Sequence, residues 1–318
     1  MTSAIRIGVS GWRYPPWRGA FYPAGLRQAD ELAYAAQKLP TVEINGSFYS
    51  LQTPASYAAW HDTTPPGFIF GVKGGRFITH MKRLRDIDKP LANFFASGIF
   101  RLQEKLGPVL WQFPPNMKYQ PQLFADFIGK LPMDTAAALT LARRRDARMT
   151  GRAALSIDAV RPMRHAMEIR NETFLDPDFI TLLRRHNVAL VVADTGNRWP
   201  QPHDVTSDFI YLRLHGATEL YQSRYSDAEL HSWADRLRAW SAGDQPPDAH
   251  LVMPNAKIRR IPRDVFCYFD NTDKLHAPSN ARQLMRLLDV KWRPPDSLEK
   301  RETLAARASA ADREVAAR

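Results

Sequence analysis

The stretch Asp208–Gly216, Asp-Phe-Ile-Tyr-Leu-Arg-Leu-His-Gly, has the pattern of a β-strand with two unlike faces. Successive side chains of a strand point to opposite sides. One side is aliphatic throughout and carries Ile210, Leu212 and Leu214. The other side begins with aromatic residues and ends with Arg213 and His215. This pattern favours a parallel strand that is buried on both sides and whose C-terminal end opens into a functional site.

Similar segments recur along the chain, with helical patterns between most of them. Strands are predicted at 5–11, 41–45, 68–73, 109–113, 166–170, 188–194, 208–216 and 265–269. Helices are predicted at 30–38, 54–61, 91–106, 121–130, 177–185, 226–241 and 278–288. Eight strands that alternate with helices predict an α/β fold, a single eight-stranded parallel (β/α) barrel, which typically takes about 250 residues.

The chain has 318 residues, and three segments account for the surplus. A second helix at 135–145 forms a helical insertion before strand five, and 243–262 is a long irregular connection. From Trp292 onward the sequence is charged and Ala-rich, without an apolar stripe. We therefore predict a barrel domain over 1–291 and a charged C-terminal tail over 292–318. A chain that ends near Lys291 is expected to melt within a few degrees of the full-length protein.

The composition predicts a folded protein, since 44% of the residues are hydrophobic. The single cysteine, Cys267, cannot form an intramolecular disulfide, which fits a reducing compartment. The N-terminal residues have no secretory apolar segment, and no window approaches the roughly 18 apolar residues of a membrane span. We expect a cytoplasmic protein that does not associate with membranes.

The net charge of +11 concentrates in two clusters. The first contains Arg143, Arg144, Arg145, Arg148 and Arg152, and the second contains Lys257, Arg259, Arg260 and Arg263. Solvated loops and helix faces explain such clusters most simply. The alternative is a surface that binds polyanions, including weak binding of nucleic acid.

Polar residues gather at the C-terminal ends of the predicted strands, on the inward face. They are Ser10, Glu43, Asn45, Lys73, Gln112, Glu168, Arg170, Asp194, Arg213 and His215. In eight-stranded barrels this end carries the active site in essentially every characterised enzyme. Asp270 or Asn271 joins the set, because the alternation of strand eight is ambiguous. The alternative is a structural network in which carboxylates neutralise the three cations, since buried charges persist only when they are paired.

Loops that follow the first three strands add further candidates. His80 lies after strand three, and Trp12 and Tyr49 lie after strands one and two. These aromatic residues either pack or form the wall of a substrate site. The sequence has no phosphate loop, nucleophile elbow, Cys-x-x-Cys pair or dinucleotide fingerprint, so we expect no redox cofactor.

The chain resembles the YecE-like family, domain of unknown function seventy-two, from Ile5 to about Leu288. The resemblance is carried by 8–12, 17–23, 42–49, Lys73, 79–80, 109–115, 168–170, Asp194, 213–216 and Asn271, among which are Gly-Val-Ser-Gly-Trp and Arg-Leu-His-Gly. It implies a triosephosphate-isomerase-type barrel, in agreement with the strand count. It implies no established activity.

The first functional hypothesis is an enzyme that acts on a small anionic substrate, phosphorylated or carboxylated, through general acid/base chemistry. Lys73, Arg170 and Arg213 would hold the anion. Glu168 or Glu43 would be the base, with His215 or His80 as its acid partner. The remaining candidates are Asp194 for catalysis and Asn45, Tyr49, Gln112, Trp12 and Asn271 for substrate binding. If Glu168 is the base, Glu168→Gln is expected to cost little stability.

Two alternatives remain open. One is a metal-dependent hydrolase or nuclease with Glu43, Glu168, Asp194 and His215 as ligands, although three cations in the same mouth count against a metal. The other is a non-catalytic barrel that binds nucleic acid or a small ligand.

Overall fold

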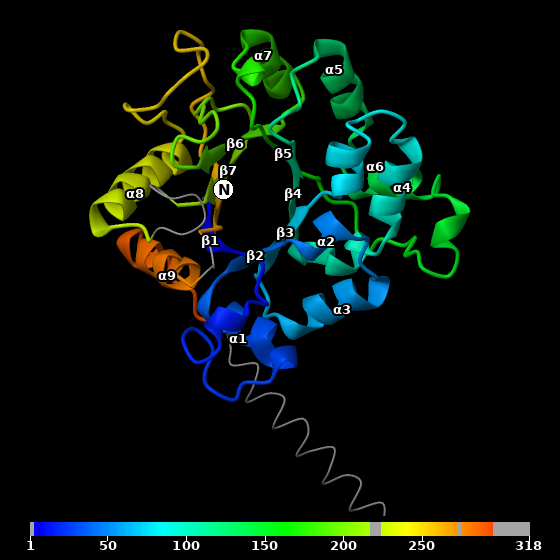
Figure 1. Ribbon diagram of the computed structural model, residues 1–318, viewed down its shortest axis with the longest axis horizontal. Coiled ribbons are helices and arrows are strands. Elements are labelled where there is room, and N and C mark those ends of the chain that lie inside the picture. The colour runs from blue at the N-terminus through cyan, green and yellow to red at the C-terminus, as the bar shows by residue number, and fades with distance from the viewer. Residues whose placement is uncertain (1–2, 217–223, 272–274, 295–318) are drawn as a thin grey trace, which may run out of the picture.

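The eight predicted strands form a closed parallel barrel in chain order, and β8 pairs with β1. The computed structural model describes residues 3–216, 224–271 and 275–294. The strands are β1 Ile5–Ser10, β2 Thr41–Ile44, β3 Ile69–Lys73, β4 Leu106–Gln112, β5 His165–Glu168, β6 Ala189–Asp194, β7 Phe209–Leu214 and β8 Asp264–Phe269. The view along the barrel in Figure 1 shows these strands as a ring with helices around it. The predicted α/β barrel is confirmed.

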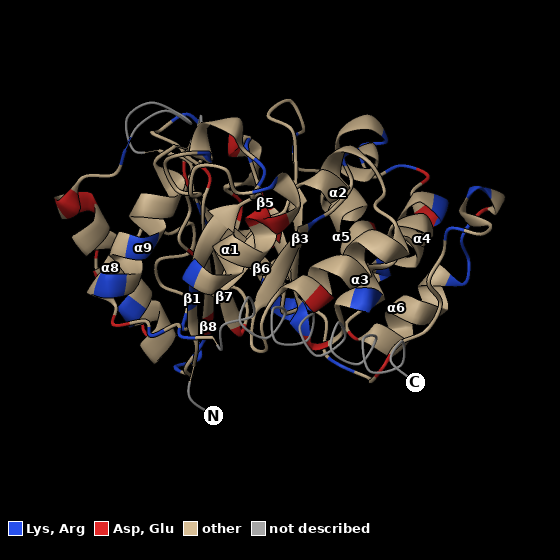
Figure 2. Ribbon diagram, turned by 90° about the horizontal axis from the view of Figure 1, so that it is seen from below, with Lys and Arg blue, Asp and Glu red and all other residues tan. Residues whose placement is uncertain are grey.

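The helices surround the barrel and bury its outer surface (Figure 2). They are α1 Glu31–Lys38, α2 Gly46–Tyr49, α3 Pro54–Thr63, α4 Asp88–Ala96, α5 Pro121–Lys130, α6 Thr135–Ala142, α7 Pro177–Arg185, α8 Asp227–Ala242 and α9 Ala277–Leu287. The helix α6 is the predicted insertion between β4 and β5, and it packs against α4. Among the helices in the described ranges, none is long and apolar enough to cross a membrane.

The two faces of β7 lie in two separate hydrophobic cores. Ile210, Leu212 and Leu214 belong to the large core between the strands and the helices. Phe209 and Tyr211 belong to the small core inside the barrel. The predicted alternation along β7 is therefore confirmed, and it directs Arg213 to the barrel interior.

A glycine in β3 makes room for the two tyrosines that fill the barrel. A Cβ atom on Gly71 would lie 2.8 Å from the Tyr268 hydroxyl and 3.0 Å from the Tyr211 hydroxyl. The tyrosine rings themselves are 5.1 Å apart. The polar groups above these tyrosines therefore lie on a layer of packed side chains, and no open channel runs beneath them.

The predicted helix at 91–106 and the start of the fourth strand were wrong. The helix α4 ends at Ala96, and Gly98 follows with a φ of 119°. Glycine is required there, since a Cβ atom would lie 2.5 Å from Cα of Pro54. A 3₁₀ segment at Ile99–Lys105 leads into β4, which begins at Leu106 and includes Gly107 and Pro108.

Trp292 packs on the barrel domain although the sequence assigned it to the tail. Its indole Nε1 donates a 2.8 Å hydrogen bond to the carbonyl of Ala36 in α1. Its ring lies 6.4 Å from the ring of Phe68, between centroids. The boundary predicted at 291/292 therefore falls within the packed structure, and residues 295–318 of the predicted tail lie outside the described residues.

Candidate active site

The guanidinium group of Arg213 is the centre of a buried polar network at the C-terminal end of the barrel. Its Nη1 donates a 2.7 Å hydrogen bond to Oε2 of Glu168. Its Nη2 donates to Oε1 of Glu43 at 3.0 Å and to Oδ2 of Asp270 at 2.8 Å. Arg213 is only 1% exposed. One buried cation therefore holds three carboxylates from three other strand ends.

Glu168 is fixed in its ionised form by this network. Its Oε1 accepts hydrogen bonds from Nε of Arg170 at 2.9 Å and from Nε2 of Gln112 at 2.8 Å. Burial alone would raise the pKa of Glu168, but the charges of Arg213 and Arg170 lower that pKa well below its usual range. A carboxylate that binds protons so weakly is a poor general base near neutral pH.

Glu43 and His215 lie equally deep. Glu43 accepts a 2.6 Å hydrogen bond from the hydroxyl of Tyr211 and another from the hydroxyl of Ser10. His215 is fully buried, with Nδ1 3.2 Å from Oδ2 of Asp270. Burial and the charge of Arg213 lower the pKa of His215. These side chains form the base of the site, and the expected role of Arg213 as an anion ligand does not fit its saturated donors.

A cavity of about 720 Å³ opens above the network. Six predicted residues line it, namely Asn45, Tyr49, Lys73, His80, Gln112 and Arg170. Four more residues, absent from the predicted substrate-binding and catalytic sets, also line it: Phe48, Arg76, Met81 and Asp270. Arg76 follows Lys73 by three residues in a glycine-rich turn, a signal that the sequence offered. The cavity is therefore the place where the strand ends and loops meet.

Lys73 is buried without a carboxylate partner among the residues that the structure describes. It ends β3, is 8% exposed, and places Nζ 4.2 Å from the centroid of the Phe48 ring. Within the described part of the chain, Nζ has no hydrogen bond and no carboxylate within 4.0 Å. Burial first, and then the charge of Arg213, lower the pKa of Lys73 to about 8. With this pKa, the amine exchanges its proton at mildly alkaline pH.

His80 lies on the other side of the same aromatic ring. It sits in a single π-helical turn, Phe77–Met81, and its ring meets the Phe48 ring edge-on, with centroids 5.1 Å apart. Its Nδ1 lies 2.9 Å from the hydroxyl of Thr79, and within the described ranges Nε2 forms no hydrogen bond. Burial, followed by the charges of Lys73 and Arg170, lowers the pKa of His80 to about 4. At neutral pH the imidazole is uncharged.

Three predicted residues neither line this cavity nor bond to Arg213. The prediction that Asp194 faces inward was wrong, because it shares its side of β6 with Leu190 and Val192 of the outer core. Its Oδ2 accepts a 3.0 Å hydrogen bond from the hydroxyl of Tyr225. Trp12 packs edge-on against another tryptophan. Asn271 donates a 3.1 Å hydrogen bond to an asparagine of α9.

The carboxylates do not form a metal centre. Among the residues that the structure describes, no group of three or more His, Cys, Asp or Glu side chains is arranged to hold a metal ion. Glu43, Glu168 and Asp270 converge on the guanidinium group of Arg213, which already supplies their cation. Because Asp194 is also turned away, the metal-dependent hypothesis loses its ligand set.

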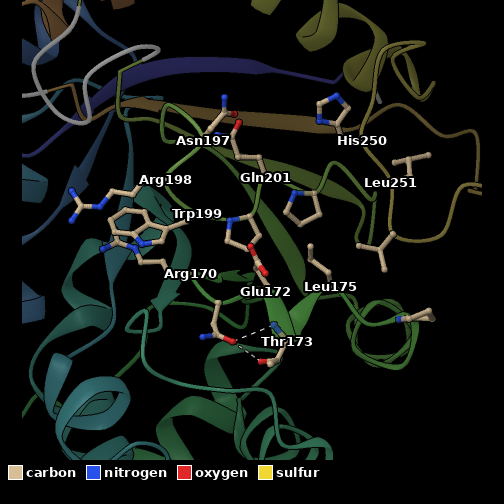
Figure 3. Close-up of a pocket in the computed structure, with 15 residues that line it drawn as sticks. Arg170, Glu172, Thr173, Leu175, Asn197, Arg198, Trp199, Gln201, His250 and Leu251 are labelled. Carbon is tan, nitrogen blue, oxygen red and sulfur yellow. Dashed lines mark hydrogen bonds between the residues drawn. The ribbon is translucent and has the colours of Figure 1, made fainter.

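Arg170 also lines a second cavity, of about 820 Å³, shown in Figure 3. This cavity lies among the loops that follow β5 and β6, with His250 and Leu251 on its far side (Figure 3). The Arg170 guanidinium lies 3.9 Å from the centroid of the Trp199 ring. Arg170 therefore lies between two cavities at the mouth of the barrel and lines both of them.

The fold and the site define a triosephosphate-isomerase-type barrel with a polar cavity at its C-terminal mouth. The chain belongs to the family described as "Protein of unknown function DUF72", which it matches over residues 6–304. The "UPF0759 protein YunF" of Bacillus subtilis is 24% identical over 323 residues, which cover 91% of this chain and 96% of the relative. The family resemblance expected from the motifs is confirmed.

Solved structures of DUF72 family proteins have a similar fold. The protein from Thermotoga maritima is 23% identical, with a TM-score of 0.67, and the match covers 90% of this chain and 99% of that one. A protein from Enterococcus faecalis is 18% identical, with a TM-score of 0.63 and coverage of 92% and 98%. At these identities the likeness concerns the fold alone.

Proposed function

We propose that this protein is an enzyme that acts on a small anionic substrate by proton transfer at the mouth of the barrel. The observation that carries this proposal is Lys73, a buried amine with no counter-ion among the described residues and a pKa of about 8 in a cavity of about 720 Å³. Structural lysines are normally paired when they are buried. A perturbed, unpaired amine in a cavity is typical of a functional site.

Lys73 and His80 take the acid/base roles in this proposal. A group transfers protons most effectively when its pKa lies near the working pH. With a pKa of about 8, the Lys73 amine is divided between its two forms at mildly alkaline pH. His80 is a neutral imidazole that can donate or accept a hydrogen bond. The two side chains contact the same ring, that of Phe48, so one small substrate can reach both.

The charge of the lining favours an anion. Lys73, Arg76 and Arg170 contribute cations, and Asp270 is the carboxylate of the lining. Asp270 is already bonded to Arg213 within the network below. An anionic substrate therefore meets a positive surface in a partly desolvated cavity, where charge-assisted hydrogen bonds are strong.

The buried network supports this chemistry by holding the cavity residues in place. Glu168 orients both Gln112 and Arg170 through hydrogen bonds of 2.8 and 2.9 Å, and it is held in turn by Arg213. Such a second layer of hydrogen bonds fixes the side chains that touch a ligand. The proposal covers proton-transfer reactions of the hydrolase, lyase or isomerase type.

The test is turnover of a panel of small phosphorylated and carboxylated metabolites by the full-length protein. Lys73→Met is expected to lower turnover of any substrate found by roughly 10²–10⁴-fold. Lys82→Met is the matched control, because Lys82 lies on the same loop, pairs with Asp86 at 3.9 Å and does not line the cavity. Equal turnover by wild type and Lys73→Met, or binding without turnover across the panel, would contradict the proposal.

A further inference from the structure

A separate basic cavity lies at the opposite end of the barrel. Its volume is about 210 Å³. Its lining comes from segments that precede strands: Asn187 before β6, 205–208 before β7 and 257–263 before β8. Because the strands are parallel, these segments meet at the N-terminal end, away from the mouth where Lys73 lies. The cavity therefore has no part in the chemistry proposed above.

Arg263 is the buried cation of this cavity. It is 2% exposed, and its Nε donates a 3.3 Å hydrogen bond to the carbonyl of Ser207. Its Nη2 donates to the carbonyl of Arg259. Its Nη1 is buried and has no hydrogen-bond partner in the described parts of the chain, and no carboxylate there lies within 4.0 Å. A buried guanidinium without a counter-ion is costly.

The neighbouring side chains add to this positive charge. Lys257 and Arg259 line the cavity, are exposed, and form no ion pair within the ranges described. Burial, followed by the charge of Arg259, lowers the pKa of Arg263. Arg184 also lines the cavity and lies 3.8 Å from Asp204. Asp208 contributes a single negative charge to the lining, which does not balance these cations.

We propose that this cavity binds an oxyanion of the phosphate class, which supplies the counter-ion that Arg263 lacks. The cavity is smaller than the roughly 300–1,000 Å³ typical of pockets for drug-sized ligands, so it suits a compact group. Arginine side chains present several N–H donors that match the oxygens of a phosphate. The group is either free inorganic phosphate or a backbone phosphate of a nucleic acid.

The experiment is calorimetric titration of full-length protein with inorganic phosphate. The double variant Lys257→Ser/Arg259→Ser removes two exposed side chains and leaves Arg263 in place, so the fold is preserved. Its Kd for phosphate is expected to rise about tenfold, the loss that follows from removing charge-assisted hydrogen bonds. Arg260→Ser is the matched control, because Arg260 is exposed on the same segment, lies 3.9 Å from Asp244 and does not line the cavity.

Two further arms separate this site from the mouth and identify the source of the phosphate. The titrations are repeated in the Lys73→Met background, which removes a proposed anion ligand at the mouth. The weakening caused by the double variant is expected to persist there, so failure here is distinct from failure of the proposed enzyme. A random single-stranded oligonucleotide is titrated at two salt concentrations. Salt-sensitive binding that the double variant loses identifies a backbone phosphate, and binding of inorganic phosphate alone identifies a free ion. Equal phosphate affinity in wild type, the double variant and Arg260→Ser would overturn the proposal.

Discussion

Nη1 of Arg213 and Oε2 of Glu168 are 2.7 Å apart in a region where neither side chain is more than 1% exposed. This pair changes the interpretation of the site. The sequence suggested Glu168 as a catalytic base, whose buried charge would lower the stability of the folded protein. In the structure, that charge compensates two arginines, so Glu168 supports the site and Lys73 faces the cavity.

The first prediction concerns the stability of Glu168→Gln. We expect this change to lower the free energy of unfolding by about 3 kcal/mol, the lower end of the range for a broken buried ion pair. The lower end applies because Glu43 and Asp270 still pair with Arg213. Urea unfolding measures the effect, with the exposed Glu172→Gln as the control, expected within about 0.5 kcal/mol of wild type. If Glu168→Gln has the same free energy of unfolding as wild type, the hypothesis that Glu168 is the catalytic base is supported instead.

The second prediction follows from the lowered pKa of Glu168. Because its folded pKa lies below its unfolded value of about 4.3, its contribution to stability is fully present above that value. The contribution is lost as the pH falls toward the folded pKa. The difference in unfolding free energy between wild type and Glu168→Gln should therefore be constant from pH 7 to 5 and narrow at pH 3.5. A difference that is independent of pH would contradict the assigned ion pairs.

The third prediction concerns the reactivity of Lys73. At pH 8 about half of its amine is neutral, whereas a surface lysine with a pKa of about 10.4 is only ~0.4% neutral. Cyanate, a small reagent that fits the cavity, should therefore carbamylate Lys73 before Lys82. Peptide mass spectrometry measures both rates, and the rate at Lys73 should follow a pKa of about 8. A Lys73 that reacts no faster than Lys82 would refute a lowered pKa.

The fourth prediction concerns the C-terminal boundary. Trp292 packs against α1 and Phe68, so a chain that ends at Lys291 loses this contact. We expect Trp292→Ala to cost about 1–3 kcal/mol, in line with the loss of a partly buried aromatic side chain. A chain that ends at Pro294 should have the same melting temperature as the full-length protein. If the chain that ends at Lys291 also has this melting temperature, the boundary at 291/292 was correct.

The sequence predicted the barrel well because most strands alternate or end in polar residues. For β6 and β8 the inward side was predicted wrongly or left open, because both strands have apolar residues on both sides. In β6, the run Ala-Leu-Val-Val-Ala before Asp194 gives no alternation, so the wrong prediction that Asp194 faces inward had no alternation to support it. In β8, Val-Phe-Cys-Tyr-Phe is equally uniform, and Asp270 proved to be the inward residue next to Arg213.

The sequence also could not predict which cation is paired with the buried carboxylates and which one faces the cavity. Alternation places Arg213 and Lys73 on the same inward face, but it does not tell which cation is saturated. That depends on distances across the barrel, where Glu43 of β2 and Glu168 of β5 reach Arg213 of β7. Because these carboxylates bond to Arg213, none of those in the described residues forms an ion pair with Lys73.

The anion site at the mouth is tested most directly by the position of selenate in soaked crystals of the wild-type protein. We expect an anomalous peak within hydrogen-bond distance of Lys73 or Arg170, inside the cavity lined by His80 and Gln112. Peaks confined to the basic cluster at 143–152, with none at the mouth, would contradict this expectation.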